Sequence, residues 1–153
     1  MTQITPKNKV VEDSLSRPVV VIGTFDGVHR GHQSLFAKAK EIAKLNQVKT
    51  LVLTFDPHPK ELLLPRFPPR LCSQDEKVRR IHKCLVDQVK TLRFDKDLAS
   101  TSARDFVEEI LVKELHPTAV VVGFNFSFGK GGKADPQDLR DLLKDHDLSL
   151  IHI

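Results

Sequence analysis

The sequence contains a pair of histidines at a spacing suited to phosphate chemistry. His29 and His32 lie at the end of a glycine-rich segment that runs from Gly23 to His32. If a helix begins near Gly31, both imidazoles lie on one side of its first turn and can donate to phosphate oxygens. The free N–H groups and the dipole of that helix end also favour an anion. The segment therefore predicts a site for a nucleoside triphosphate.

The glycines of this segment let the backbone turn sharply and approach a ligand, because no Cβ stands in the way. Asp26 is itself anionic, so we expect it to shape the turn or to approach a metal–nucleotide complex. The segment lacks the Gly-Lys-Ser/Thr of a P-loop and the glycine spacing of the dinucleotide fingerprint. The alternative is a strand-to-helix turn with incidental histidines, which their paired spacing disfavours. The predicted triphosphate-binding residues are Gly23, Thr24, Phe25, Asp26, Gly27, His29, Gly31 and His32.

Two later segments carry further candidate ligand groups. In the Asp-Pro-His-Pro turn at 56–59, His58 lies between two prolines and either reaches a ligand or decorates a rigid turn. Asn125 follows an apolar run, and its amide either meets a ligand or stabilises its own turn. The phenylalanines at 124, 126 and 128 would share one face of an extended segment. Some of them complete the core, and one at the ligand edge can lie against a flat aromatic ring.

These groups need a scaffold, and the chain alternates strand and helix patterns. Val19–Ile22 is a continuous β-branched run, which is typical of a strand covered on both faces. Further strands are predicted over 48–55, 86–94, 118–123 and 148–153. Helices are predicted from near Gly31, from a capping box at Ser73, from Thr101 or Ser102, and from Asp135. Residues 60–72 hold further prolines and predict a long loop or flap.

This alternation predicts an α/β fold, a Rossmann-like doubly wound parallel sheet of about five strands in a single domain. Residues 1–17 are predicted to be a polar lead-in, and the domain spans 18–153. In such sheets ligands bind beyond the carboxyl ends of the strands, where the strand order reverses. Each candidate segment follows a predicted strand. We therefore expect all of them to meet at that edge.

Composition and charge favour a globular protein with a small anionic ligand. Of 153 residues, 40% are hydrophobic and 29% charged, and the net charge is +4. This falls short of the dense basic face of a nucleic-acid binder. The clusters 77–80 and 130–133 could touch phosphates, although solvated surface is favoured for the first. No apolar run resembles a signal peptide or a membrane span, and Cys72 and Cys84 are interpreted as free thiols, so a cytoplasmic location is predicted.

Taken together, the segments resemble a known family. The His29-x-Gly-His32 pattern resembles the nucleotidylyltransferase superfamily, and alone it would also admit cytidylyltransferases and other adenylyltransferases. With the turn at 56–59 and the segment 123–130, the chain resembles the N-terminal FMN adenylyltransferase (FAD synthetase) module of bacterial bifunctional riboflavin kinase/FAD synthetase. The resemblance runs from about Val19 to Leu143 and includes Phe106-Val-Glu-Glu-Ile110.

The resemblance implies transfer of AMP from ATP to FMN, which gives FAD and pyrophosphate with Mg²⁺. It implies that His29 and His32 hold the ATP phosphates and stabilise the leaving pyrophosphate, and that Asn125 lies near the reacting phosphates and the metal. The triphosphate site is then an ATP site. The FMN phosphate is already an ionised nucleophile, so alignment and charge stabilisation suffice without a general base. The predicted FMN-binding residues are Asp56, Pro57, His58, Pro59, Asn125 and Phe128.

The sequence departs from the family pattern at its end. Family members carry a Ser-Ser-Thr-x-x-Arg segment after the strand that here ends at Ile153, and a riboflavin kinase module after that. We therefore expect a truncated domain with reduced activity. Two other functions stay open: a non-catalytic module that binds flavin nucleotides, and a nucleotidylyltransferase with another acceptor. The sequence does not indicate an oligomeric state or the direct metal ligands.

Overall fold

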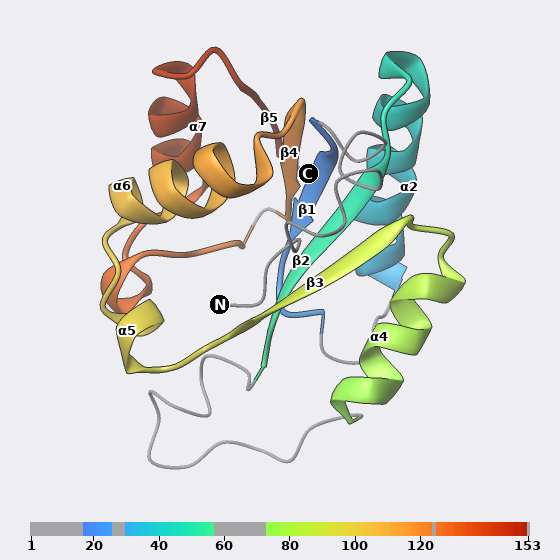
Figure 1. The fold of residues 1–153 in the computed structure, drawn as a ribbon, viewed down its shortest axis with the longest axis horizontal. Coiled ribbons are helices and arrows are strands. Elements are labelled where there is room, and N and C mark those ends of the chain that lie inside the picture. The colour runs from blue at the N-terminus through green and yellow to red at the C-terminus, as the bar shows by residue number, and fades with distance from the viewer. Residues whose placement is uncertain (1–16, 26–29, 57–72, 124, 153) are drawn as a thin grey trace.

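The computed structural model describes residues 17–25, 30–56, 73–123 and 125–152, which form a layered α/β domain (Figure 1). Five strands make one parallel sheet in the order β3-β2-β1-β4-β5. The strands are β1 (Val19–Ile22), β2 (Thr50–Asp56), β3 (Gln88–Arg93), β4 (Ala119–Val122) and β5 (Ser149–His152). The predicted fold class, a doubly wound parallel sheet, is confirmed. Most of the predicted lead-in and all of the predicted flap lie outside the described residues.

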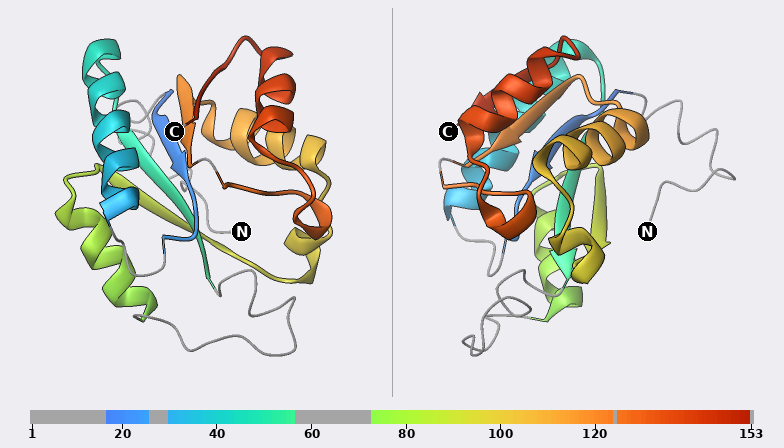
Figure 2. Two further views of the ribbon diagram at one scale, coloured as in Figure 1. Left: turned by 180° about the vertical axis from the view of Figure 1, so that it is seen from behind. Right: turned by 90° about the vertical axis from the view of Figure 1, so that its left-hand side faces the viewer.

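Helices cover both faces of the sheet, as the two views of Figure 2 show. The helical elements are α2 (Arg30–Asn46), α4 (Gln74–Lys83), α5 (Lys96–Ala99), α6 (Ala103–Asp105), η2 (Phe106–Leu115), η3 (Lys130–Gly132) and α7 (Pro136–Lys144). Buried side chains of α2 and α4 pack on one face of the sheet, and those of η2 and α7 pack on the other.

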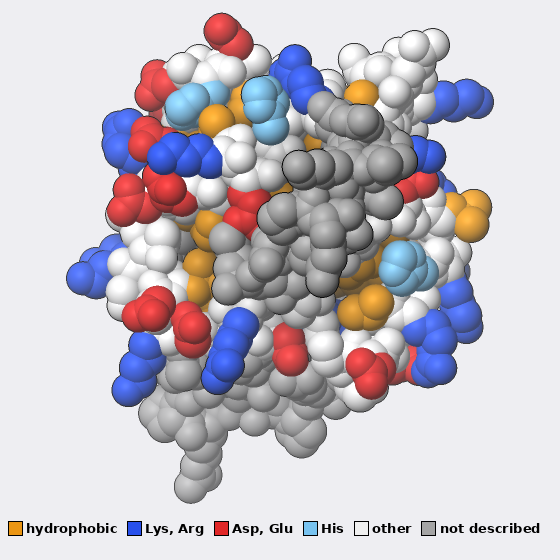
Figure 3. All heavy atoms as spheres, viewed as in Figure 1, with side chains coloured by type: hydrophobic (Ala, Val, Ile, Leu, Met, Phe, Trp, Pro, Cys, Tyr) orange, Lys and Arg blue, Asp and Glu red, His pale blue; other side chains and the backbone are white. Residues whose placement is uncertain are grey.

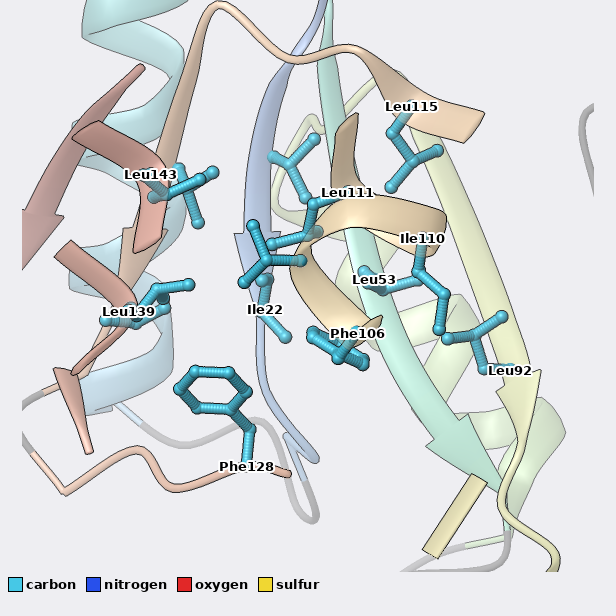
Figure 4. Packing of buried hydrophobic residues seen from close by; sticks show 14 of the residues in the cluster. Ile22, Leu53, Leu92, Phe106, Ile110, Leu111, Leu115, Phe128, Leu139 and Leu143 are labelled. Atoms are coloured by element: carbon cyan, nitrogen blue, oxygen red, sulfur yellow. The ribbon is translucent and has the colours of Figure 1, made fainter. Parts of the chain in front are cut away.

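Alternating side chains of the central strands supply the core of each layer. Val20 and Ile22 of β1 face η2 and α7, whereas Val19 and Val21 face α2 and α4. This alternation follows from the two-residue period of a strand, and it explains why β1, which is covered on both faces, has no polar position. Figure 4 shows the η2 and α7 layer, in which Ile22 and Leu53 of the sheet lie opposite leucines of both helices.

The start of one strand differs from the sequence prediction, because the end of the preceding helix takes up the residues before it. β2 begins at Thr50 rather than at 48, because Gln47 adopts a left-handed conformation and the Val48 N–H donates to the Ala43 carbonyl at the end of α2. The cap at Ser73 is confirmed, since its side chain accepts from the Glu76 N–H. The cap at Ser102 is confirmed in the same way, with the Asp105 N–H as donor.

The helix predicted after Ser102 has an unexpected geometry. From Phe106 to Leu115 it is a π-helix, and the His116 N–H closes it by donating to the Leu111 carbonyl. Its apolar stripe is buried as predicted. The short helix α5, capped by Asp95, was not predicted. In the chain, both elements lie between β3 and β4. In space, their residues reach the edge of the sheet where the candidate segments were expected.

The strand order reverses between β1 and β4. From β1 the chain moves outward through β2 and β3, and it then returns to place β4 on the other side of β1. Connections that leave two such strands diverge to opposite sides of the sheet, so they open a crevice between them. The predicted location of the ligand site corresponds to this point.

Candidate active site

A cavity of about 500 Å³ lies at the carboxyl ends of β1 and β4. Ile22 and Gly23 line it from the first strand, and Gly123 and Asn125 line it from the second. Phe55 reaches it from β2 and His32 from α2. Described residues of the loop after β1 and of the segment after β4 therefore meet at one edge, as expected, whereas Asp56, the one described residue of the turn at 56–59, does not line the cavity.

The loop after β1 folds back on itself at the floor of this cavity. The Gly23 N–H donates to the Leu53 carbonyl and continues the β1–β2 ladder by one residue. Phe25 then adopts a left-handed conformation with φ of 53° and buries its ring beneath Gly23. A Cβ at Gly23 would lie 2.7 Å from that ring, so only glycine fits without a shift. This close packing places the loop backbone against the cavity.

His32 lies in the first turn of α2 and lines the cavity. Its imidazole contacts the Phe25 ring edge to face, with the ring centroids 5.1 Å apart. The helix spans Arg30–Asn46, which agrees with the predicted start near Gly31. The positive end of its dipole favours an anion.

Several predicted site residues lie outside the described part of the chain. These are Asp26, Gly27, His29, Pro57, His58 and Pro59. Their predicted roles stay predictions. Of the described ones, Gly31 is exposed at the start of α2, and Asp56 ends β2 with its carbonyl accepting from the Phe94 N–H. Neither of these two residues lines the cavity, whereas Gly23, Thr24, Phe25 and His32 do.

An aromatic wall forms the opposite side of the cavity. Five phenylalanines make it: Phe55, Phe94, Phe106, Phe126 and Phe128. The rings of Phe126 and Phe128 are stacked with centroids 5.5 Å apart, and Phe128 also contacts Phe106 at 5.7 Å. The segment is not a strand, however, because the Phe126 N–H turns back to the Gly123 carbonyl. Phe124 lies outside the described residues.

Phe128 serves the core as well as the cavity. It is 7% exposed and belongs to the buried cluster between the sheet, η2 and α7. Figure 4 shows its ring near Phe106 and Leu139. Its predicted part in flavin binding stays a prediction, whereas the expectation that some of these phenylalanines complete the core is confirmed.

Asn125 is exposed and lines the cavity from the β4 side. Within the described part of the chain, no hydrogen bond ties its side chain to its own turn. Its amide is therefore available to a ligand. This favours the first of the two roles that the sequence left open.

A second glycine-rich loop borders the same cavity. Gly129, Gly131 and Gly132 all have positive φ, and all three line the cavity. The loop is closed by paired N–H to carbonyl bonds between Phe128 and Ala134. Sequence reasoning considered only the flanking Lys130 and Lys133, which are exposed. The signal it missed was the run of glycines directly after a phenylalanine-rich segment.

The basic cluster at 77–80 contains one clear correction. Lys77 is 6% exposed, so the interpretation of this cluster as solvated surface is wrong for that residue. Its ammonium donates to the Thr24 carbonyl at 2.9 Å and to the Phe55 carbonyl at 3.0 Å. The interpretation rested on charge, whereas helix periodicity places Lys77, four residues before Ile81, on the sheet-facing side of α4. Arg79 and Arg80 are exposed, as predicted.

Surface charge shows no single sign on the face in Figure 3, where basic and acidic side chains are interspersed around the margin. Such mixing is typical of a solvated surface rather than of a nucleic-acid interface. No cluster of three or more His, Cys, Asp or Glu side chains among the described residues could hold a metal ion. In the same part of the chain, no helix is both long enough and apolar enough to span a membrane.

Comparison with known proteins identifies relatives of the whole domain. A family model described as FAD synthetase matches residues 11–153. The bifunctional riboflavin kinase/FMN adenylyltransferase of Escherichia coli K12 is 39% identical over 118 residues, which cover 76% of this chain and 38% of the relative. The enzyme of the same name from Bacillus subtilis is 29% identical over 140 residues, covering 90% of this chain and 44% of the relative. The chain thus spans less than half the length of these curated relatives.

Solved structures agree at the level of the fold. A Streptococcus pneumoniae chain described as a macrolide-efflux protein superposes with a TM-score of 0.79 and 31% identity, over 90% of this chain and 46% of that one. Pantothenate synthetase from Thermus thermophilus gives a TM-score of 0.56 with 14% identity, over 94% of this chain and 59% of that one. The second likeness shows the fold alone.

Proposed function

The chain belongs to the FAD synthetase family, and we propose that its domain transfers the adenylyl group of ATP to FMN, giving FAD and pyrophosphate. One observation carries the proposal: a single cavity is lined both by the loop after β1 with His32 of α2 and by several phenylalanines. ATP and FMN each combine a phosphate group with a flat ring. A cavity of this kind suits a reaction that joins two such molecules through their phosphates.

The ATP phosphates are assigned to the loop after β1 and the first turn of α2. Gly23, Thr24 and Phe25 line the cavity, and the positive end of the α2 dipole favours an anion. His32 would donate from its ring nitrogen to a phosphate oxygen, with His29 as its predicted partner. Donors placed in advance stabilise the charge that develops on the leaving pyrophosphate.

The isoalloxazine ring of FMN is assigned to the aromatic wall. Phe94 and Phe126 line the cavity and are partly exposed, and aromatic rings favour stacked or edge-to-face contact with another ring. Asp56, Pro57, His58 and Pro59 are predicted to border the ring at the end of β2. Asn125 lies between the two sides and is proposed to contact the reacting phosphates.

The chemistry requires alignment rather than a protein nucleophile. An oxygen of the FMN phosphate attacks the α-phosphorus of ATP, and the bond from that phosphorus to the pyrophosphate oxygen breaks. The electron pair leaves with the pyrophosphate. Because the attacking oxygen is already ionised, no side chain has to remove a proton from it, and catalysis follows from positioning and charge stabilisation.

Mg²⁺ is proposed to enter with ATP. Protein sites for this ion usually provide one or two carboxylates and leave the rest to water and substrate phosphates. Among the described residues, the Asn125 amide is one oxygen ligand that the cavity offers. When bound, the ion neutralises phosphate charge.

The test is to supply the protein with ATP, Mg²⁺ and FMN and to follow FAD and pyrophosphate together. We expect the two products in equal amounts, and no FAD when riboflavin replaces FMN, since riboflavin lacks the phosphate nucleophile. Separate titrations of ATP and FMN complete the design. Binding of both without FAD would identify a flavin-nucleotide-binding module. Nucleotide binding without FMN affinity would indicate another acceptor.

A further inference from the structure

A buried lysine donates hydrogen bonds to backbone carbonyls of two segments that border the cavity. Lys77 lies in α4, in the basic cluster at 77–80, and its side chain is directed toward the carboxyl ends of β1 and β2. The Thr24 carbonyl that it holds belongs to the proposed phosphate loop. The Phe55 carbonyl belongs to the residue before Asp56, where the proposed flavin turn begins.

α4 is well placed to fix the position of this ammonium group. The Ser73 side chain caps the first turn of the helix, and Ile81 is fully buried in the core cluster below it. Gln74 donates from its side-chain amide to the Thr91 hydroxyl of β3. α4 is therefore held at several points. The Lys77 ammonium group has a fixed position as a result, and its two hydrogen bonds fix the ends of the two strands.

The carbonyl of Thr24 is held from two directions. The Thr54 hydroxyl of β2 donates to it at 3.0 Å, and Lys77 donates to it at 2.9 Å. Because a peptide unit is planar and trans, fixing this carbonyl also fixes the N–H of Phe25 on the opposite side of the same plane. Phe25 has a left-handed backbone, which persists only where its surroundings hold it.

We propose that Lys77 is a positioning residue that holds the phosphate loop after β1 and the end of β2 in one fixed relation. The inference rests on the proposed function, because its purpose is to align the two substrates that these segments bind. An ammonium group suits the task, since it can donate to several carbonyls at once. A misplacement of reacting groups by about 1 Å can cost about 100-fold in rate.

The experiment compares Lys77→Met with two controls on the same helix. Methionine keeps most of the side-chain length and removes the donors. Ile81→Ala loosens the packing of α4 but leaves both carbonyls bonded, so it reports general destabilisation. Lys83→Met removes a charge from an exposed position. All variants are assayed as full chains, at a temperature where thermal unfolding shows them to be folded.

For Lys77→Met we expect kcat to fall about 100-fold. We also expect the Kd for ATP, titrated alone, to rise about tenfold, because the loop loses one of its two anchors. Ile81→Ala and Lys83→Met should keep kcat within about threefold of the parent, an effect smaller than the loss of one hydrogen bond. A kcat for Lys77→Met that matches Ile81→Ala would overturn the proposal. If Lys77→Met does not fold, Lys77→Leu, which also lacks a donor, replaces it, with the same comparison.

If the proposed function is wrong, the same assays give a different set of results. If the parent protein makes no FAD, the acceptor assignment fails, and the role of Lys77 is then decided by ATP titration alone. An ATP affinity that falls in Lys77→Met but not in Ile81→Ala supports the positioning role. Equal ATP affinity in these two variants overturns it.

Discussion

The two sides of the cavity are built in different ways. The side proposed to bind phosphate consists of consecutive residues, Gly23 to Phe25, together with His32 of α2, which follows them in the chain. The aromatic side is assembled from phenylalanines that range from Phe55 to Phe128 and come from different elements. The first depends on the conformation of one short loop. The second depends on how distant elements pack.

This difference predicts different responses to substitution. Stabilisation of charge depends steeply on where a donor lies, so a single change on the phosphate side should reduce the rate sharply. Apolar contact accumulates with area, and five rings share it on the aromatic side, so a single change there should weaken binding by a modest factor. The variants below separate these two behaviours.

The largest effect is expected for His32→Ala. Loss of one preorganised donor to developing charge typically lowers kcat by about 100- to 1000-fold. The KM for FMN should change little, because His32 lies on the phosphate side. Steady-state assays of FAD formation provide the measurement. His82→Ala on the exposed surface of α4 is the control, and it should behave as the parent does.

The double variant His29→Ala/His32→Ala extends this test to a residue that lies outside the described part of the chain. If the two imidazoles act as a unit on the same phosphates, the double variant should lose little more than the more damaging single variant does. Undiminished FAD formation by the double variant would rule out the proposed role of both histidines.

A backbone effect of the next size is expected for Gly23→Ala. The new Cβ would lie 2.7 Å from the buried Phe25 ring, and such overpacking typically costs about 1–3 kcal/mol of folding stability. The loop must shift to relieve the contact, so ATP affinity should fall as well. Denaturant unfolding and ATP titration measure the two effects.

Gly123→Ala is the matched control. Gly123 follows β4, the other strand at the point where the strand order reverses. Its Cβ would meet its nearest neighbours at 3.7 Å, which is ordinary van der Waals contact. It should therefore retain both stability and ATP affinity. Equal losses in the two variants would show that the phosphate loop does not depend on the close fit of Gly23 over Phe25.

The same difference determines what could be predicted from the sequence. The strands, the caps at Ser73 and Ser102 and the loop after β1 follow from local patterns, because the responsible residues are near neighbours in the chain. The aromatic wall does not, since nothing local relates Phe55 or Phe94 to Phe128. Lys77 was misinterpreted for the same reason: its partners, Thr24 and Phe55, are 53 and 22 residues away. The π geometry of η2 likewise had no signal in its apolar stripe.

A smaller and more selective effect is expected for Phe94→Leu on the aromatic side. Phe94 lines the cavity and contacts Phe55 edge to face, with centroids 6.2 Å apart. An aromatic pair contributes about 0.5–1.5 kcal/mol beyond its buried area, so the KM for FMN should rise by about two- to tenfold while that for ATP stays constant. Phe36→Leu, in the core beneath α2, should lower stability without this selectivity. An equal rise in both KM values would remove the distinction between the two sides.

The smallest effect is expected at the start of α7, where no cavity-lining residue lies, and it gives the baseline for changes in stability alone. Asp135 caps this helix by accepting from the Asp138 N–H, and that hydrogen bond holds the pKa of the exposed Asp135 carboxyl below its usual 3.8. A carboxyl pKa that is lowered in the folded state stabilises the fold at pH values above the unfolded-state pKa. This contribution is lost as the pH falls through the folded-state pKa.

The variant Asp135→Asn keeps a good helix cap but has no carboxyl group to titrate. Thermal unfolding from about pH 6 to about pH 2 should therefore show the parent losing slightly more stability than the variant. Both should have the same KM for ATP and for FMN at neutral pH, and a change in either would extend the substrate site to α7.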